Sequence, residues 1–127
     1  MKVYKILAID DEVMFVDLVK MNLEKEGQFE VRVETNPNNA LSAALEFKPD
    51  VILLDYIMPE KDGGEVAAQF SVSPDLKHIP VIMMTALMSP EETDELGYKE
   101  TPTGIVLPKP ISVEVLKTCI KKFLGEE

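Results

Sequence analysis

Short apolar runs recur along the chain and are separated by stretches with a different hydrophobic pattern. Residues 3–9, 51–54, 80–85 and 104–107 are mostly apolar. Such short runs are typical of parallel strands that are buried on both faces. Residues 29–34 instead alternate apolar and charged side chains, which indicates an edge strand with one face in solvent. The pattern therefore predicts five strands, of which the second lies at an edge of the sheet.

Between these strands, apolar residues recur three or four positions apart, as they do on the buried face of a helix. We expect five helices with their caps, over residues 12–26, 36–48, 63–72, 89–97 and 112–125. Their predicted buried residues are Phe15, Leu18, Val19 and Leu23 in the first helix, Ala40, Leu41, Ala44 and Leu45 in the second, and Val113, Leu116, Ile120 and Phe123 in the fifth. Strands that alternate with helices form a parallel sheet through right-handed crossovers. We therefore expect an α/β fold, a flavodoxin-like three-layer sandwich whose five-stranded parallel sheet has the order 2-1-3-4-5 and carries five helices.

The length and composition are those of one soluble globular domain. A chain of 127 residues with 46% hydrophobic and 28% charged residues can bury a sizeable core, and we expect residues 1–127 to form a single domain. No apolar run approaches the roughly 18 residues of a membrane span, and the N-terminal residues lead into a strand without a signal-peptide pattern. We expect a cytoplasmic protein without a membrane partner.

Charge and cysteine content exclude several functional classes. Cys119 is the only cysteine, so an internal disulfide and a cysteine zinc site are excluded, and we expect it to be a small apolar residue of a helix. The formal net charge of −10 would repel a phosphate backbone, so this chain alone should not bind nucleic acid. His78 is the only histidine and precedes Ile79 and Pro80 in a predicted loop, where we expect it to be solvated.

Polar side chains follow four of the predicted strands at their carboxyl ends. They are Asp10, Asp11, Asp55, Thr85 and Lys109. Each alone has a structural explanation, because aspartate caps helices and turns, threonine favours strands and lysine is usually solvated. Together they lie at one edge of the predicted sheet, where the strand order places the first strand beside the third. We therefore expect these five side chains to form one site.

The residue types at this edge suit phosphoryl transfer. Two carboxylates about 4 Å apart repel by roughly 4 kcal/mol at an effective dielectric near 20, and a divalent cation would relieve that repulsion. Hard oxygen ligands with open positions suit Mg²⁺. A carboxylate beside Mg²⁺ can attack phosphorus, with Lys109, the Thr85 hydroxyl and the Ala86 amide as donors to the phosphoryl oxygens. No other pair of nucleophile and base is visible in the sequence.

Four motifs carry a resemblance to a known family over essentially the whole length of the chain. They are Ile6-Leu-Ala-Ile-Asp-Asp-Glu12, Leu54-Asp-Tyr-Ile-Met-Pro-Glu-Lys-Asp-Gly63, Ile82-Met-Met-Thr-Ala86, and Lys109-Pro110. In this order and spacing, the sequence resembles the receiver domain of two-component response regulators, a member of the CheY-like superfamily.

The resemblance implies a role for each residue of the site. Asp55 would accept a phosphoryl group from the phosphohistidine of a histidine kinase or a phosphotransfer protein, forming an aspartyl phosphate in a phosphorelay. Mg²⁺ would be held by Asp11, Asp55 and the backbone carbonyl of Ile57, with Asp10 reaching it through water. Thr85 and Lys109 would contact the phosphoryl oxygens. The family also implies a cis bond between Lys109 and the proline that follows it.

The chain departs from the family pattern in its output region and around the acceptor. The family's aromatic switch residue lies three positions before the lysine, where this chain has Val106, and Pro108 before the lysine is unusual. Residues 96–104 resemble a loop where the fourth helix should continue. In the family, the residues two positions after the acceptor and after the threonine border the path of hydrolytic water. Here they are Ile57 and Leu87, which cannot orient water, and we expect a long-lived phosphoryl group.

Three functions are compatible with these residues. The first is a phosphoacceptor signalling module, which catalyses only its own phosphorylation and dephosphorylation and signals to an unidentified downstream target or fused output domain. The second is a protein-interaction module with the same fold that acts without phosphorylation. The third is a small Mg²⁺-dependent phosphatase, which we rank last because no residue can act as a general acid for a leaving group.

Overall fold

The structure, a computed structural model, describes residues 2–93, 97–101 and 104–125. Its elements follow one another along the chain as β1 (Tyr4–Ile9), α1 (Val13–Glu24), β2 (Phe29–Glu34), η1 (Pro37–Asn39), α2 (Ala40–Phe47), β3 (Val51–Asp55), α3 (Gly63–Ser71), β4 (Val81–Thr85), η2 (Pro90–Glu92), β5 (Lys99–Thr101), β6 (Gly104–Pro108) and α4 (Val113–Phe123). The strands form one sheet of order β2-β1-β3-β4-β6-β5. All neighbouring strands are parallel except β5 and β6, which are antiparallel.

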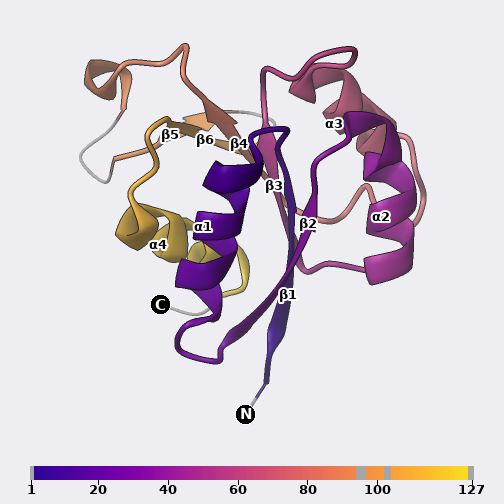
Figure 1. The fold of residues 1–127 in the computed structure, drawn as a ribbon, viewed down its shortest axis with the longest axis horizontal. Coiled ribbons are helices and arrows are strands. Elements are labelled where there is room, and N and C mark those ends of the chain that lie inside the picture. The colour runs from indigo at the N-terminus through magenta and orange to yellow at the C-terminus, as the bar shows by residue number, and fades with distance from the viewer. Residues whose placement is uncertain (1, 94–96, 102–103, 126–127) are drawn as a thin grey trace.

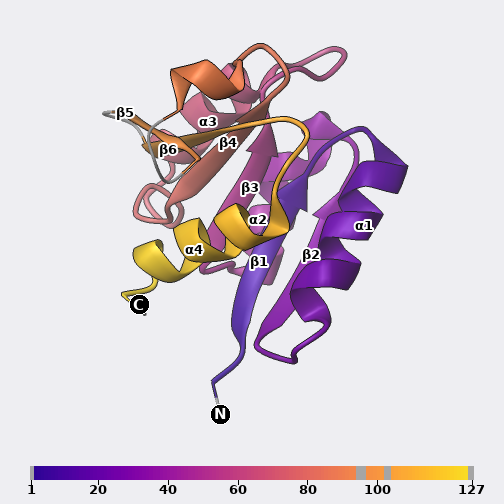
Figure 2. The same ribbon diagram turned by 90° about the vertical axis from the view of Figure 1, so that its left-hand side faces the viewer.

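The helices lie on both faces of this sheet (Figure 1). Helices α1 and α4 cover one face, and α2 and α3 cover the other. Turning the molecule by 90° brings α1 and α4 to the front, with the strands behind them (Figure 2). The predicted flavodoxin-like three-layer sandwich is therefore confirmed, with strand β6 in the place of the predicted fifth strand.

Each helical layer encloses its own hydrophobic core. The central strands β1 and β3 contribute to both cores, because alternate residues point to opposite faces. Ile6, Leu53 and Ile82 face α1 and α4, whereas Leu7, Ile52 and Leu54 face α2 and α3. All residues of β3 are buried, as the continuous apolar run predicts.

The main difference from the predicted fold lies between β4 and β6. The predicted helix over residues 89–97 is wrong for the described part of this segment, which contains one 3₁₀ turn, η2, followed by the extra antiparallel strand β5. The capping interaction itself forms, since the Ser89 backbone N–H donates to Glu92 Oε1 at 3.3 Å. No apolar stripe follows it, however, and the buried Tyr98 anchors the chain in an extended form. The described ranges accordingly contain four α-helices instead of five.

The buried faces of two helices also differ in detail from the prediction. Leu18 in α1 is 55% exposed and Leu45 in α2 is 41% exposed, while Val16 and Ala43 are buried in their place. Helical spacing alone cannot decide between neighbouring stripes when a helix carries apolar residues on more than one side. Cys119 is fully buried in α4, as predicted.

Candidate functional site

The five predicted site residues come together at the carboxyl ends of the parallel strands. Asp10 and Asp11 follow β1, Asp55 ends β3, Thr85 ends β4 and Lys109 follows β6. The sheet order brings β1, β3, β4 and β6 side by side at this edge. The parallel register aligns the ends, with Asp55 opposite Met84 and Thr85 opposite Pro108.

Three carboxylates form an acidic cluster at this edge. One oxygen each of Asp10, Asp11 and Asp55 lies within 4.8 Å of the others. Asp10 is fully buried and Asp55 is 4% exposed, while Asp11 is half-buried. This donor set of closely spaced hard oxygens fits a small divalent cation, which would offset their mutual repulsion.

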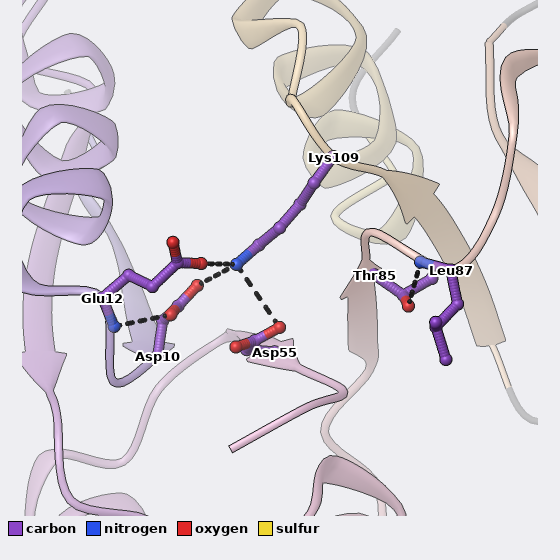
Figure 3. A network of polar contacts seen from close by, with 6 residues as sticks. All are labelled: Asp10, Glu12, Asp55, Thr85, Leu87 and Lys109. Carbon is purple, nitrogen blue, oxygen red and sulfur yellow. Dashed lines mark hydrogen bonds and ion pairs between the residues drawn. The ribbon is translucent and has the colours of Figure 1, made fainter. Parts of the chain in front are cut away.

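Lys109 provides the positive charge of the site. Its Nζ donates to Asp10 Oδ2 at 2.9 Å and to Glu12 Oε1 at 2.6 Å, and it lies 3.4 Å from Asp55 Oδ1. Figure 3 shows the lysine reaching across the site toward these three carboxylates. Nζ also lies 4.4 Å from the centre of the Phe15 ring, which the cation contacts from one side. The Lys109 side chain is only 11% exposed, so these partners are its immediate surroundings.

The loop after β6 directs Lys109 into the site. The Lys109–Pro110 peptide bond is cis, as the family resemblance implies. The Lys109 backbone N–H donates to the Thr85 carbonyl at 2.9 Å, which extends the pairing of β4 and β6 beyond Pro108. The missing N–H of Pro108 therefore does not prevent the two strand ends from meeting.

The pKa values of Asp55 and Lys109 are both shifted by the surroundings of the site. Burial, followed by the charge of Asp10, raises the pKa of Asp55 to about 6, while Lys109 and the Ile57 backbone N–H act in the opposite direction. For Lys109, burial would lower the pKa, but hydrogen bonds to Glu12 and Asp10 and the charges of Asp10 and Asp55 outweigh it and raise the pKa. At neutral pH the site therefore holds the Lys109 cation beside an Asp55 carboxyl that is mostly ionised.

Thr85 ends β4 beside the end of β3, and Ile57 follows Asp55 by two residues. Thr85 is 7% exposed, and its Oγ1 accepts a hydrogen bond from the Leu87 backbone N–H at 3.0 Å. Figure 3 shows Thr85 on the side of Asp55 away from Glu12. Ile57 donates its backbone N–H to the Asp55 carboxylate. The predicted roles of the Ile57 carbonyl and of the Ala86 amide stay predictions.

Gly63 packs closely against the backbone of Asp55 and Tyr56. A Cβ at this position would lie 2.4 Å from the Asp55 carbonyl oxygen and 2.8 Å from the Tyr56 Cα, both backbone atoms. The Gly63 N–H also donates to the Tyr56 carbonyl at 2.7 Å. The start of α3 can approach the end of β3 this closely only without a side chain.

Two residues contact Lys109 without being singled out by the sequence pattern. Glu12 follows the aspartate pair directly, so its acidity is compatible with a place in the site. Its position at the start of the first predicted helix is also typical of a residue that only caps the helix. Its backbone N–H donates to Asp10 Oδ1 at 2.9 Å, and this contact places its carboxylate beside the lysine. Phe15 belongs to the apolar pattern of α1, and nothing in that pattern indicates contact with a cation. His78 is exposed, as predicted, and lies outside the site.

Comparison with known proteins decides which family this site belongs to. The family model of the response regulator receiver domain matches residues 6–121, which include all five site residues. The chain is a receiver domain of this family. Its members take part in two-component signal transduction, in which phosphorylation and a dependence on magnesium are expected.

Solved structures place this receiver domain among response regulators and kinase receiver domains. The chemotaxis protein CheY4 of Vibrio cholerae is 30% identical over 95% of this chain and 98% of its own, with a TM-score of 0.78. The receiver domain of a signal transduction histidine kinase from Syntrophus aciditrophicus is 27% identical over 97% of this chain and 91% of its own, with a TM-score of 0.77.

A third structure has the same fold at lower identity. It is the receiver domain of a sensor histidine kinase from Pseudomonas aeruginosa PAO1, 22% identical over 98% of this chain and 99% of its own, with a TM-score of 0.78. That structure contains a magnesium ion in its active-site cleft. Within the described ranges of the present receiver domain, no helix has the length and hydrophobicity needed to cross a membrane.

Proposed function

We propose that Asp55 is the phosphoacceptor of this receiver domain and that a phosphohistidine of a histidine kinase or phosphotransfer protein is the donor. The placement of Asp55 carries the proposal, because it is a buried carboxylate at a strand end with an acidic cluster on one side and Lys109 Nζ at 3.4 Å. An Asp55 oxygen would attack phosphorus, and the phosphorus–nitrogen bond to the donor imidazole would break as the new phosphorus–oxygen bond forms. The imidazole nitrogen leaves with the bonding electron pair.

Asp11, Asp55 and the Ile57 carbonyl would hold Mg²⁺. When bound, the ion offsets the charge of the carboxylates and of the incoming phosphoryl oxygens. Asp10, whose oxygens accept hydrogen bonds from the Glu12 N–H and from Lys109, would reach the ion through water, as the family resemblance implies.

Lys109 and Thr85 would bind the transferred group. Lys109 would move its ammonium from the carboxylates to a phosphoryl oxygen, and its raised pKa keeps it protonated throughout. The Thr85 hydroxyl would donate to a second oxygen, and the Ala86 amide to a further one. Thr85 can do so while its oxygen still accepts from the Leu87 N–H, because a hydroxyl both donates and accepts.

The domain organisation and setting follow from this role. We infer that residues 1–127 act as one receiver domain that modifies only itself and does not turn over other substrates. Its donor would be cytoplasmic, and its output would be a downstream protein or a fused output domain. Neither nucleic acid nor membrane would contact this chain alone.

Intact-mass measurement tests the proposal directly. Incubation with acetyl phosphate and Mg²⁺ should add the mass of one phosphoryl group, and Asp55→Asn should abolish the addition. Asp62→Asn is a matched control. Asp62 is the N-cap residue of α3, in the loop that follows Asp55, and asparagine caps helices equally well. A phosphoryl adduct that persists in Asp55→Asn would show that another residue is the acceptor.

The rival function of an interaction module without phosphorylation has one observation in its favour. Val106 in β6 stands where the family carries an aromatic switch residue, and it is half-buried beside Met83. No mass increase with acetyl phosphate and Mg²⁺ would favour this rival. Turnover of an added phosphate ester would instead favour the phosphatase alternative.

A further inference from the structure

An apolar groove of about 790 Å³ lies between α3 and the outer part of the sheet. Val81, Met83 and Val106 line it from β4 and β6, and all three are half-buried. The alternate residues Ile82 and Leu107 point to the opposite face and are buried beneath α1 and α4. Parallel strands are usually covered by helices on both faces. Here the groove face of β4 and β6 has no covering helix among the described residues.

The connection between β4 and β6 explains why this face is open. Two adjacent parallel strands need a crossover, and a helix usually provides it and covers one face. In the described part of this crossover, η2 is a single 3₁₀ turn and β5 pairs with the edge of β6. The segment thus extends the sheet sideways, and its described residues do not form the expected helical layer.

The dimensions of the groove match one short helix. Its floor along β4 is five residues long, which corresponds to about 16 Å of strand and about three turns of helix. Its wall on α3 consists of Gly64, Ala67, Ala68, Phe70 and Ser71. Phe70 is only 2% exposed, and the other four are small, uncharged and on one side of the helix, so a second helix can approach α3 closely.

The charges at the two ends of the groove give its occupant a direction. Lys77 and His78 are the basic residues of its lining, and both precede β4 at one end. The opposite end contains Thr85, beside the acidic cluster. The C-terminus of a helix carries partial negative charge and its N-terminus partial positive charge. A helix would therefore lie with its C-terminus at Lys77 and its N-terminus near the phosphoacceptor edge.

The direction of α3 agrees with this assignment. Helix α3 begins at Gly63, behind Asp55, and ends at Ser71, toward the loop that contains Lys77. Crossover helices of parallel sheets run antiparallel to their strands, and α3 does so here. A helix oriented by the charges at the ends of the groove would lie parallel to α3. A crossover helix between β4 and β6 would have the same orientation, and the described part of this crossover contains none.

We propose that this groove binds one amphipathic α-helix of a partner protein, about three turns long and parallel to α3. Its apolar side would cover Val81, Met83 and Val106, and basic residues would occupy its N-terminal half. The net charge of −10 on the receiver domain favours a basic partner. The proposal goes beyond phosphoacceptance, since docking needs no phosphoryl group. Thr85 lines both the groove and the candidate site, so docking and phosphorylation can influence each other.

Two synthetic helical peptides test the docking proposal on the unphosphorylated protein. Both have one apolar stripe and the same composition, but one carries lysines in its N-terminal half and glutamates at its C-terminal end, and the other has the reverse order. Fluorescence anisotropy should show that the first binds at least about fivefold more tightly. The second peptide would place its glutamates near the acidic cluster and its lysines near Lys77 and His78. Ala68→Arg should weaken binding about tenfold or more by placing an unpaired charge in the apolar contact.

Val72→Arg is the matched control, because Val72 follows α3, is 80% exposed and does not line the groove. Ser71→Arg provides a second groove variant, and circular dichroism checks that each variant is folded. Equal binding of the two peptides, absence of binding, or binding that Ala68→Arg and Ser71→Arg leave unchanged would overturn the proposal. Sedimentation that shows self-association abolished by Ala68→Arg would instead identify a second copy as the occupant. None of these results depends on Asp55, so the phosphoacceptor proposal stands or falls separately.

Discussion

The ammonium of Lys109 lies closer to Glu12 than to Asp55, at 2.6 Å from Glu12 Oε1 and 3.4 Å from Asp55 Oδ1. Glu12 is therefore the nearest partner of the cation that would bind the phosphoryl group in the proposed reaction. The Glu12 side chain is 60% exposed, whereas that of Asp10 is fully buried. Glu12 can be neutralised without leaving a buried charge unpaired, which makes it the better site to test how the lysine is shared.

Glu12→Gln should speed phosphorylation by acetyl phosphate. The substitution weakens a competing ion pair and removes one negative charge from the approach of an anionic donor. Exposed ion pairs contribute about 0.2–1 kcal/mol, so the rate should rise by roughly fivefold at most. The measurement is the initial rate of mass gain at a fixed Mg²⁺ concentration.

Glu26→Gln is the control for this rate. Glu26 is an acidic residue that pairs with Lys117 near the other end of α1, so its loss changes the net charge by the same amount away from the site. A rate in Glu12→Gln that is unchanged or lower than in the native protein would show that Glu12 does not compete for Lys109.

Asp55→Asn should stabilise the metal-free protein at pH 7. Burial and then the charge of Asp10 raise the pKa of Asp55 to about 6, above its unfolded value of about 4. The folded state therefore binds this proton more tightly, and the free energy of unfolding decreases as pH rises from 4 through 6. Removing the charge of the carboxylate should therefore add on the order of 1–2 kcal/mol at pH 7.

Urea denaturation in EDTA at pH 5 and pH 7 measures this effect. The gain from Asp55→Asn should be smaller at pH 5, where the native carboxyl is already mostly protonated. Asp62→Asn changes the same residue type at an exposed helix cap and should leave stability nearly unchanged at both values. Lower stability of Asp55→Asn at pH 7 would contradict the prediction.

Gly63→Ala should destabilise the protein, since the new Cβ would lie 2.4 Å from the Asp55 carbonyl oxygen. Forcing extra volume into packed backbone costs about 1–3 kcal/mol. Gly64→Ala is the matched control, because its Cβ would meet only side-chain atoms, with Asp62 Oδ1 the nearest at 3.2 Å. Alanine also has a higher helix propensity than glycine. Thermal unfolding of both variants distinguishes a requirement at residue 63 from a general preference for glycine at the start of α3.

The site could be predicted from the sequence more completely than the segment beside it. Asp10, Asp55 and Thr85 each end a continuous apolar run, and parallel strands bring such ends together whatever the loops do. Residues 89–101 have no apolar run or stripe of comparable strength. Their described part follows tertiary contacts instead, with Tyr98 buried and Lys99 paired across to Val106.

Glu12 shows a different limit of prediction. Its role depends on the position of Lys109, 97 residues away along the chain, and no local pattern encodes that distance. The exposed face of α1 is a similar case, because apolar residues occupy more than one side of the helix. Which stripe is buried depends on how the helix docks on the sheet, and the sequence of the helix alone does not determine it.

The phosphoryl group on Asp55 should persist for hours as an order of magnitude, because the two side chains at the positions that border the path of hydrolytic water in the family cannot orient it. Ile57 and Leu87, at the two positions that border the path of that water in the family, are 51% and 69% exposed, so water reaches them but finds no hydrogen-bonding group. Loss of a positioned acid or base costs about 10² or more in rate.

Leu87→Glu should shorten the lifetime severalfold, because it supplies a carboxylate while the backbone N–H still donates to Thr85. Intact mass against time in Mg²⁺ buffer measures the decay, and Val72→Glu adds the same charge at an exposed position outside the site. A native phosphoryl group that disappears within a minute, or a Leu87→Glu lifetime equal to that of Val72→Glu, would contradict this account.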